Sequence, residues 1–208
     1  MPAPRRTAGA FGPALRFVFL WPYRAALAGL YRLGVRPWQL TMASLAANVV
    51  VGWLLLTGRR ALPGALLIPA GLFDVFDGAV ARLRGEDRRL GAFLDSVLDR
   101  IGDMLLFGCL YWSEAGQGHD LSAALAIVTL VIALAVSHIR AEAEAGGVSL
   151  SEGFFQRLER YVAMMIGLMV PGALVPMLVV LVVLGGATVL QRGWSALHRL
   201  AEAEAGRA

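Results

Sequence analysis

Long apolar stretches recur along the whole chain, separated by short charged or glycine-rich segments. An α-helix needs a run of about 20 apolar residues to cross the hydrocarbon core of a membrane. The pattern predicts six such spans, at about residues 38–57, 61–83, 90–112, 121–141, 154–170 and 173–190. The last two lie in one continuous apolar run, which Pro171-Gly172 favours dividing by a turn. We therefore expect an all-α integral membrane protein whose residues 38–190 form a six-span bundle.

The two ends of the chain carry a different pattern. Within residues 12–33, Arg16, Arg24 and Arg32 recur at eight-residue intervals, close to two helical turns, with apolar residues between them. This favours an N-terminal amphipathic helix lying in the membrane interface, rather than a cleaved signal peptide or a further span. Residues 200–208 predict a flexible solvated tail. The whole chain, 1–208, is therefore expected to be a single membrane domain.

Composition and charge agree with this class. Of 208 residues, 58% are apolar, against about 45–50% in soluble domains. All 19 basic residues are arginines, and six spans with a cytoplasmic N-terminus leave only Arg59 and Arg60 on the outer side. This asymmetry predicts that both termini are cytoplasmic, in a plasma or inner membrane. The net charge of +4 comes without a basic run interleaved with aromatic residues, so no nucleic-acid partner is expected. The single cysteine excludes an internal disulfide.

Aspartates interrupt the second and third spans. Their helical spacing places two sets on one face each: Asp74, Asp77, Gly78, Ala81 and Arg82, then Gly91, Asp95, Asp99 and Asp103. A short charged link makes the two spans antiparallel neighbours, so these faces can meet near their cytoplasmic ends. Carboxylates are preferred ligands of hard divalent cations, and four of them can hold two ions that act on phosphorus. The glycines and the alanine leave room for a ligand, and Arg82 offers a fork for phosphate. The alternative is that the aspartates only pair with neighbouring arginines.

The motif Asp74-x-x-Asp77-Gly78-x-x-Ala81-Arg82, eight residues, Gly91-x-x-x-Asp95-x-x-x-Asp99 resembles the signature of the CDP-alcohol phosphotransferases, also called CDP-alcohol phosphatidyltransferases. The resemblance implies a transferase with two divalent cations, Mg²⁺ or Mn²⁺. A hydroxyl of the acceptor attacks the β-phosphorus of a CDP-alcohol such as CDP-diacylglycerol, and CMP leaves. It implies metal ligation by Asp74, Asp77, Asp95 and Asp99, with Asp99 also the general base. It further implies CDP-alcohol binding by Asp74, Gly78, Ala81, Arg82 and Gly91.

A second set of polar residues is expected at the same membrane depth: Ser137, Arg140, Arg157, Arg160 and Arg192. Together the four arginines can form a pocket for a phosphate on the acceptor. Alternatively, they only orient the protein or bind lipid headgroups. The set resembles the phosphatidylinositol phosphate synthase branch, which implies inositol phosphate as acceptor, its phosphate held by Ser137, Arg157 and Arg192, and a homodimer. Glu142 departs from that branch, which tends to carry a basic residue there, so glycerol phosphate remains an alternative acceptor.

Two other classes also use intramembrane carboxylates. Intramembrane prenyltransferases are typically longer chains with two aspartate-rich motifs far apart in the sequence. Here all four motif aspartates lie within 26 residues. A non-enzymatic divalent-cation carrier would not obviously need Arg82, Arg157 and Arg192 beside its cation path. CMP release separates the transferase from both alternatives.

Overall fold

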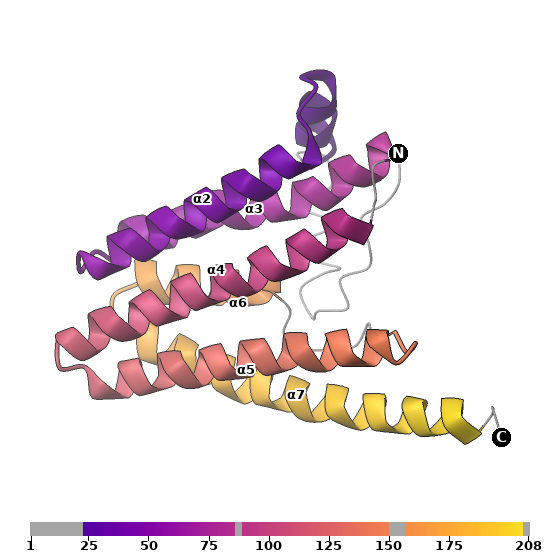
Figure 1. The fold of residues 1–208 in the computed structure, drawn as a ribbon. Helices are drawn as coiled ribbons and strands as arrows, with labels where there is room; N and C mark the ends of the chain where they lie inside the picture. Colours follow the sequence, from indigo (N-terminus) through magenta and orange to yellow (C-terminus); the bar gives the residue numbers. More distant parts are fainter. Residues whose placement is uncertain (1–22, 86–88, 150–156, 206–208) are drawn as a thin grey trace.

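The computed structural model describes residues 23–85, 89–149 and 157–205, and these ranges contain helices and turns but no strand. A helical segment at residues 23–32 comes first. Six longer helices follow: α2 (Pro37–Leu56), α3 (Ala61–Arg84), α4 (Arg89–Gly116), α5 (Asp120–Ala145), α6 (Arg157–Met169) and α7 (Leu174–Ala205). They run back and forth along one common direction (Figure 1). The all-α prediction is confirmed, and four of the six helices are long and apolar enough to cross a membrane: α2, α3, α5 and α7.

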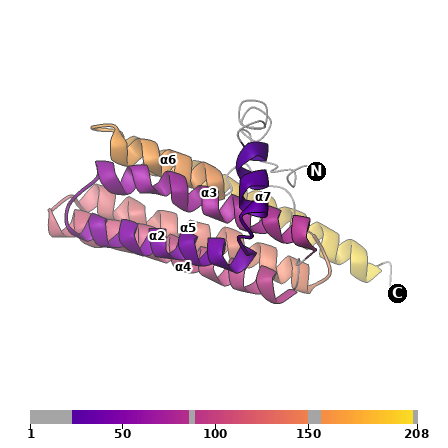
Figure 2. The ribbon, with the colours of Figure 1, turned by 90° about the horizontal axis from the view of Figure 1, so that it is seen from above.

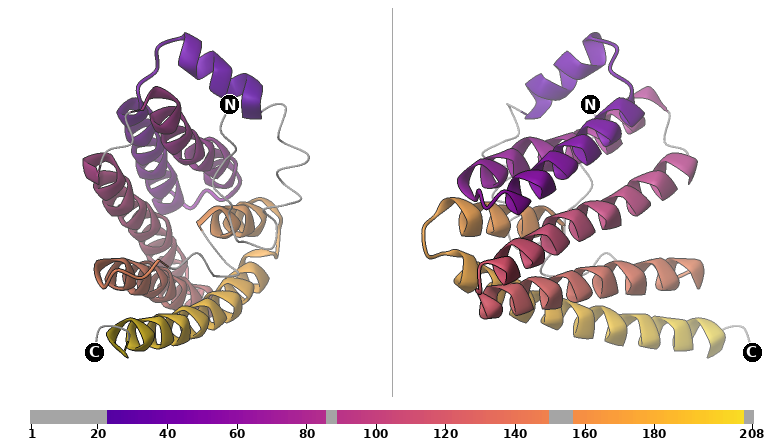
Figure 3. Two further views of the ribbon diagram at one scale, coloured as in Figure 1. Left: turned by 90° about the vertical axis from the view of Figure 1, so that its right-hand side faces the viewer. Right: turned by 60° about the vertical axis from the view of Figure 1, so that its left-hand side comes forward.

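The six helices pack as a closed ring in the order α2, α3, α6, α7, α5, α4, with the last helix returning to the first. Figure 3 shows this arrangement nearly end-on in its left view. In the described residues α4 and α6 are not neighbours in the ring but face each other across it. Polar side chains on these two helices can therefore meet inside the protein, away from lipid.

Local chemistry sets several helix ends. Pro37 occupies the first turn of α2, where its missing N–H costs nothing, and the Arg36 amide donates to Gln39 Oε1 at 2.8 Å. Gly85 ends α3 in the left-handed conformation, with φ of 66°. Gly172 adopts φ of 79° between α6 and α7, so the predicted division of the last apolar run is confirmed.

An apolar core joins the helices at the end of the ring that contains the α6–α7 turn. Its fully buried members include Leu55, Phe107, Met164 and Leu178, from four different helices. Gly64 allows α3 and α6 to approach closely, since a Cβ there would lie 2.8 Å from Met169 Cγ. The core holds this end of the ring together, and the signature aspartates lie toward the other end.

The segment 23–32 crosses the ends of α2 and α3 at a steep angle (Figure 2). Tyr23 stacks on Phe76 with ring centroids 5.3 Å apart, and the guanidinium of Arg84 lies 5.2 Å from the centre of the Tyr31 ring. The Arg84 guanidinium also donates to the Tyr31 carbonyl at 3.3 Å. These contacts fix the segment against the C-terminal half of α3, which carries the signature aspartates.

Two helices differ from their predicted spans. Residues 200–205, expected to belong to a flexible tail, are helical and complete α7, because Ala, Leu, Glu and Arg are good helix formers and no glycine follows Gly193 in this helix. In the described residues α6 has 13 residues, which at 1.5 Å each is about 20 Å, shorter than the roughly 30 Å of a hydrocarbon core. Parts of three predicted segments lie outside the described part of the chain: residues 12–22 of the interfacial helix, 154–156 of the fifth span and 206–208 of the tail.

Candidate active site

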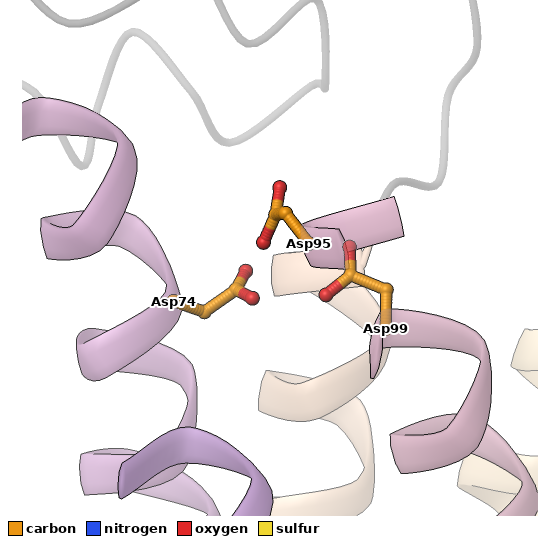
Figure 4. Close-up of side chains that lie close together, drawn as sticks. All are labelled: Asp74, Asp95 and Asp99. Atoms are coloured by element: carbon orange, nitrogen blue, oxygen red, sulfur yellow. The ribbon is translucent and has the colours of Figure 1, made fainter. Parts of the chain in front are cut away.

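Three of the predicted aspartates converge inside the ring. Asp74 comes from α3, while Asp95 and Asp99 come from successive turns of α4, as their four-residue spacing predicts. Each offers a carboxylate oxygen, and these oxygens all lie within 4.8 Å of one another. Figure 4 shows the three side chains pointing into the space between the two helices. The spacing argument for a shared acidic face is confirmed for these three residues.

The charges of this trio are only partly compensated within the described residues. Arg157 reaches from α6 and its Nη1 donates to Oδ1 of both Asp74 and Asp99. In contrast, Asp95 Oδ1 is buried and has no hydrogen-bond partner among the described residues. One guanidinium therefore serves three carboxylates, and a buried oxygen without a partner is costly. Clustered carboxylate oxygens are the ligand type that Mg²⁺ and Mn²⁺ prefer, so this donor set fits a divalent cation.

The fourth aspartate of the motif is oriented differently. Asp77 is buried, and its Oδ2 accepts a hydrogen bond from Thr41 of α2 at 2.8 Å. Asp77 is not part of the group whose oxygens lie within 4.8 Å. It nevertheless lies close enough to Asp95 and Asp74 to interact with both electrostatically. The structure thus brings three of the four predicted ligands together and places the fourth next to them, held by Thr41.

The small residues and the arginine of the motif surround the acidic group. A Cβ on Gly78 would lie 3.3 Å from Arg82 Nη1, so the glycine leaves space for that guanidinium along α3. Burial raises the pKa of the Tyr23 hydroxyl and the nearby charge of Arg82 opposes that rise, so Arg82 also faces the segment 23–32. A Cβ on Gly91 would meet no described atom within 4 Å. Among the described residues, the space beside Gly91 is therefore open, as expected for a residue that leaves room for a ligand.

The five residues predicted to bind an acceptor phosphate have different surroundings. Arg157 contacts the aspartates, while Arg160 is buried and its Nη2 donates to Asp103 Oδ2 at 2.6 Å. Arg140 is exposed and pairs with Glu144 at 2.8 Å. The buried Arg192 donates to the Val136 carbonyl at 3.2 Å, directly beside Ser137.

Several residues outside the predicted set organise this region. Tyr161 accepts a hydrogen bond from Arg157 Nη2 at 3.1 Å and donates to Asn48 Oδ1 at 2.8 Å. Arg100 donates to the Ser137 carbonyl at 3.2 Å and to the Ser96 carbonyl at 2.8 Å. The sequence offers a signal for Tyr161, which lies one helical turn after Arg157. Asn48 is a polar residue in the apolar α2, and it joins this helix to Tyr161 of α6.

A small polar cavity lies beside the trio. Its volume is about 10 Å³, and it is lined by Thr41, Ser44, Leu45, Asn48, Asp74, Leu98, Asp99 and Arg157. That volume corresponds to about one water molecule. The side chains around the carboxylates are thus closely packed, so a bound phosphate requires them to move.

Comparison with protein families decides the class of this site. The model of the family described as CDP-alcohol phosphatidyltransferase matches residues 35–191, which include every helix that contributes to the site. The chain belongs to the CDP-alcohol phosphatidyltransferase family. The resemblance carried by the aspartate motif is thus confirmed.

Curated relatives point to one branch of the family. The phosphatidylinositol phosphate synthase of Mycobacterium marinum is 36% identical over 141 residues, covering 67% of this chain and 60% of that protein. The same enzyme of Corynebacterium glutamicum is 36% identical over 151 residues, covering 71% of this chain and 68% of that protein. The chain thus spans only about three fifths of the first of these relatives.

Solved structures of this family are also similar. Phosphatidylinositol phosphate synthase of Mycobacterium tuberculosis with CDP-DAG bound superposes with a TM-score of 0.74 and 30% identity, over 84% of this chain and 92% of that chain. The same enzyme in complex with manganese and citrate has a TM-score of 0.74 and 31% identity, over 84% of this chain and 88% of that chain.

Proposed function

We propose that the protein transfers a phosphatidyl group from CDP-diacylglycerol to inositol phosphate and releases CMP. The observation that carries this proposal is the convergence of Asp74, Asp95 and Asp99 inside the ring, next to a buried arginine. The named relatives support inositol phosphate over glycerol phosphate as acceptor. A carrier is disfavoured because it would have no evident use for Arg157 beside its cation path, where Arg157 pairs with Asp74 and Asp99.

In this proposal Asp74, Asp77, Asp95 and Asp99 would hold two divalent cations, Mg²⁺ or Mn²⁺. The bound cations would stabilise the attacking and leaving oxygens at phosphorus. Asp77 needs a modest reorientation from Thr41 to join the three clustered carboxylates. The fit rests on the oxygen donor set and on the buried Asp95 oxygen that lacks a described partner.

The protein groups divide the remaining tasks. Asp99 accepts the proton of the acceptor hydroxyl on a carboxylate oxygen as that hydroxyl attacks the β-phosphorus, and the bond to the CMP oxygen breaks. Arg82 binds the diphosphate of the donor, over the space that Gly78, Ala81 and Gly91 leave free. Keeping the site inside the ring limits the access of water, which would otherwise hydrolyse the donor.

For the acceptor phosphate we propose Arg157, Arg192 and Ser137. Arg100 and Arg192 bind neighbouring carbonyls of α5, those of Ser137 and Val136, so they fix the part of α5 that faces the site. Arg160 and Arg140 are assigned to other tasks, because Asp103 and Glu144 already bind them.

The membrane arrangement is part of the same proposal. All six helices cross or enter the membrane. The N-terminal helix predicted within residues 12–33 lies in the membrane interface, and the steep angle between residues 23–32 and the six helices supports this (Figure 2). The active site and both termini face the cytoplasm, since the outer end then carries only Arg59 and Arg60. The single domain 1–208 functions as a homodimer.

The test is CMP release by the purified protein in detergent with CDP-diacylglycerol and Mn²⁺ or Mg²⁺. Inositol phosphate, glycerol phosphate, inositol and serine are offered in parallel. Release with inositol phosphate alone supports the proposal. Release with glycerol phosphate alone keeps the mechanism and refutes the acceptor, with Glu142 the first residue to exchange. No CMP with any acceptor refutes the proposed reaction.

A further inference from the structure

Arg157 occupies a site that the surrounding helices build around its guanidinium. A Cβ on Gly102 of α4 would lie 3.0 Å from Arg157 Nη2, so only glycine leaves that space without a shift. The guanidinium carbon lies 5.0 Å from the centre of the Tyr161 ring, and the Tyr161 hydroxyl accepts from Nη2 at 3.1 Å. We call Gly102, Tyr161 and Asn48 the arginine cradle.

The cradle is itself fixed. The buried Tyr161 hydroxyl donates to Asn48 Oδ1 at 2.8 Å, and Asn48 Nδ2 donates to the Ser44 carbonyl at 2.9 Å. Asn48 is 1% exposed and Tyr161 3% exposed. Hydrogen bonds between buried groups of α2 and α6 therefore hold Nη2 of Arg157 in place. With Nη2 held there, Nη1 reaches across the ring to α4.

That other side contacts the same oxygens that a metal would need. Nη1 of Arg157 donates to Oδ1 of Asp74 and to Oδ1 of Asp99, which come from the two helices of the carboxylate trio. A guanidinium and a divalent cation cannot share these oxygens, because their positive charges would lie within a few ångströms of each other in a site of low dielectric. Occupation by one excludes the other.

We propose that Arg157 is an internal competitor for the metal centre, whose guanidinium and a divalent cation alternate on Asp74 and Asp99. This inference rests on the proposed function and assigns Arg157 a second role. When a cation takes the two carboxylates, the guanidinium turns toward the acceptor phosphate. Metal and acceptor therefore promote each other's binding, since such coupling is reciprocal.

The experiment is a titration with Mn²⁺ alone, followed by electron paramagnetic resonance, on the detergent-solubilised protein without substrate. Arg157→Gln should bind Mn²⁺ at least about tenfold more tightly than the wild type, a change of about 1.4 kcal/mol. Arg157→Lys keeps the charge, but its single ammonium cannot span both carboxylates and Tyr161. It should also bind more tightly, by about threefold or more.

The lysine variant separates competition from simple charge repulsion. If only Arg157→Gln binds more tightly and Arg157→Lys equals the wild type, repulsion explains the effect and the competition is refuted. Arg100→Gln is the matched control, because Arg100 follows Asp99 but donates to Ser96 and Ser137. It should change the affinity by less than about twofold, since it leaves the carboxylate contacts intact.

A milder variant tests the cradle. Tyr161→Phe removes the hydroxyl and keeps the ring, so the fold should persist and Mn²⁺ affinity should rise about twofold to fivefold, in the range of the net contribution of one hydrogen bond. An unchanged affinity in this variant refutes the cradle. If neither the wild type nor any variant binds Mn²⁺, the metal centre and hence the proposed function fail. If all bind it equally, only the competition fails.

Discussion

The carboxylates at the two ends of the ring differ in how their charges are met. At the end that contains the α6–α7 turn, Glu114 is 2% exposed, and both of its oxygens are bound. Arg60 pairs with Oε1 at 2.7 Å, while Ser122 donates to Oε2 at 2.6 Å and His119 lies 3.2 Å from the same oxygen. At the other end Asp74 and Asp99 share Arg157, and one oxygen of Asp95 has no described partner.

The contrast separates a structural carboxylate from functional ones. Glu114 ties the N-terminal end of α3 to the α4–α5 turn, and its partners leave nothing for a ligand to satisfy. A cavity of about 690 Å³ lies beside it, far larger than the one beside the aspartates, yet it adjoins a carboxylate whose charge is already compensated. Cavity size is thus a poorer guide to the chemistry of this protein than unsatisfied charge, which a folded protein retains where function requires it.

The largest expected effect is on turnover. Asp99→Asn should lower CMP release by about 10²–10⁴-fold, because it removes the general base, while binding of CDP-diacylglycerol remains measurable. The matched variant at the other end, Glu114→Gln, should keep turnover within a few-fold once folded protein is normalised. Full activity of Asp99→Asn would remove Asp99 from its assigned role.

Bound metal should stabilise the protein through the aspartates and not through Glu114. Mn²⁺ at about 100 times its dissociation constant should stabilise the wild type by about 2.7 kcal/mol, seen as a higher unfolding temperature in detergent. Glu114→Gln should show the same increase, and Asp74→Asn should lose it. An equal increase in Asp74→Asn would place the bound metal elsewhere.

Without metal, the stability of the protein should depend more on Glu114 than on the aspartates. Glu114→Gln should lower the free energy of unfolding by about 1–3 kcal/mol, because Arg60 loses its charged partner. Asp95→Asn should leave it unchanged or raise it, since it removes one of three mutually repelling carboxylates. The unfolding temperatures of both variants in a metal-free buffer check these expectations. A larger decrease for Asp95→Asn than for Glu114→Gln would contradict the difference between the two ends.

The smallest effect is expected at Arg140. Its exposed pair with Glu144 spans one helical turn and contributes about 0.3–0.5 kcal/mol. Arg140→Gln should therefore alter stability by no more than that and turnover by less than about twofold. A loss of turnover comparable to that of Arg157→Gln would return Arg140 to the acceptor pocket.

The sequence was sufficient for features that depend on local periodicity. The apolar runs located the helices, and the four-residue spacing of Asp95 and Asp99 placed them on the face that meets Asp74. The sequence did not predict that α7 continues to Ala205, because its alanine-rich, polar end is equally typical of a solvated tail and of a helix.

Long-range polar partners could not be read in the same way. Arg60 and Glu114 are 54 residues apart, and Arg157 and Asp74 are 83 apart, so only the packing of the ring brings them together. The roles of Gly102 and Tyr161 likewise depend on α4 and α6 facing each other across the ring, which no periodicity specifies. Whether Asp77 ligates a metal stays a prediction.

The most direct test of the proposed metal centre is a structure of the protein with Mn²⁺ and CDP-diacylglycerol, with the metal located by its anomalous scattering. We expect two manganese positions, both among Asp74, Asp77, Asp95 and Asp99, and none at Glu114. Manganese at Glu114 and His119, or no manganese at the aspartates, would contradict it.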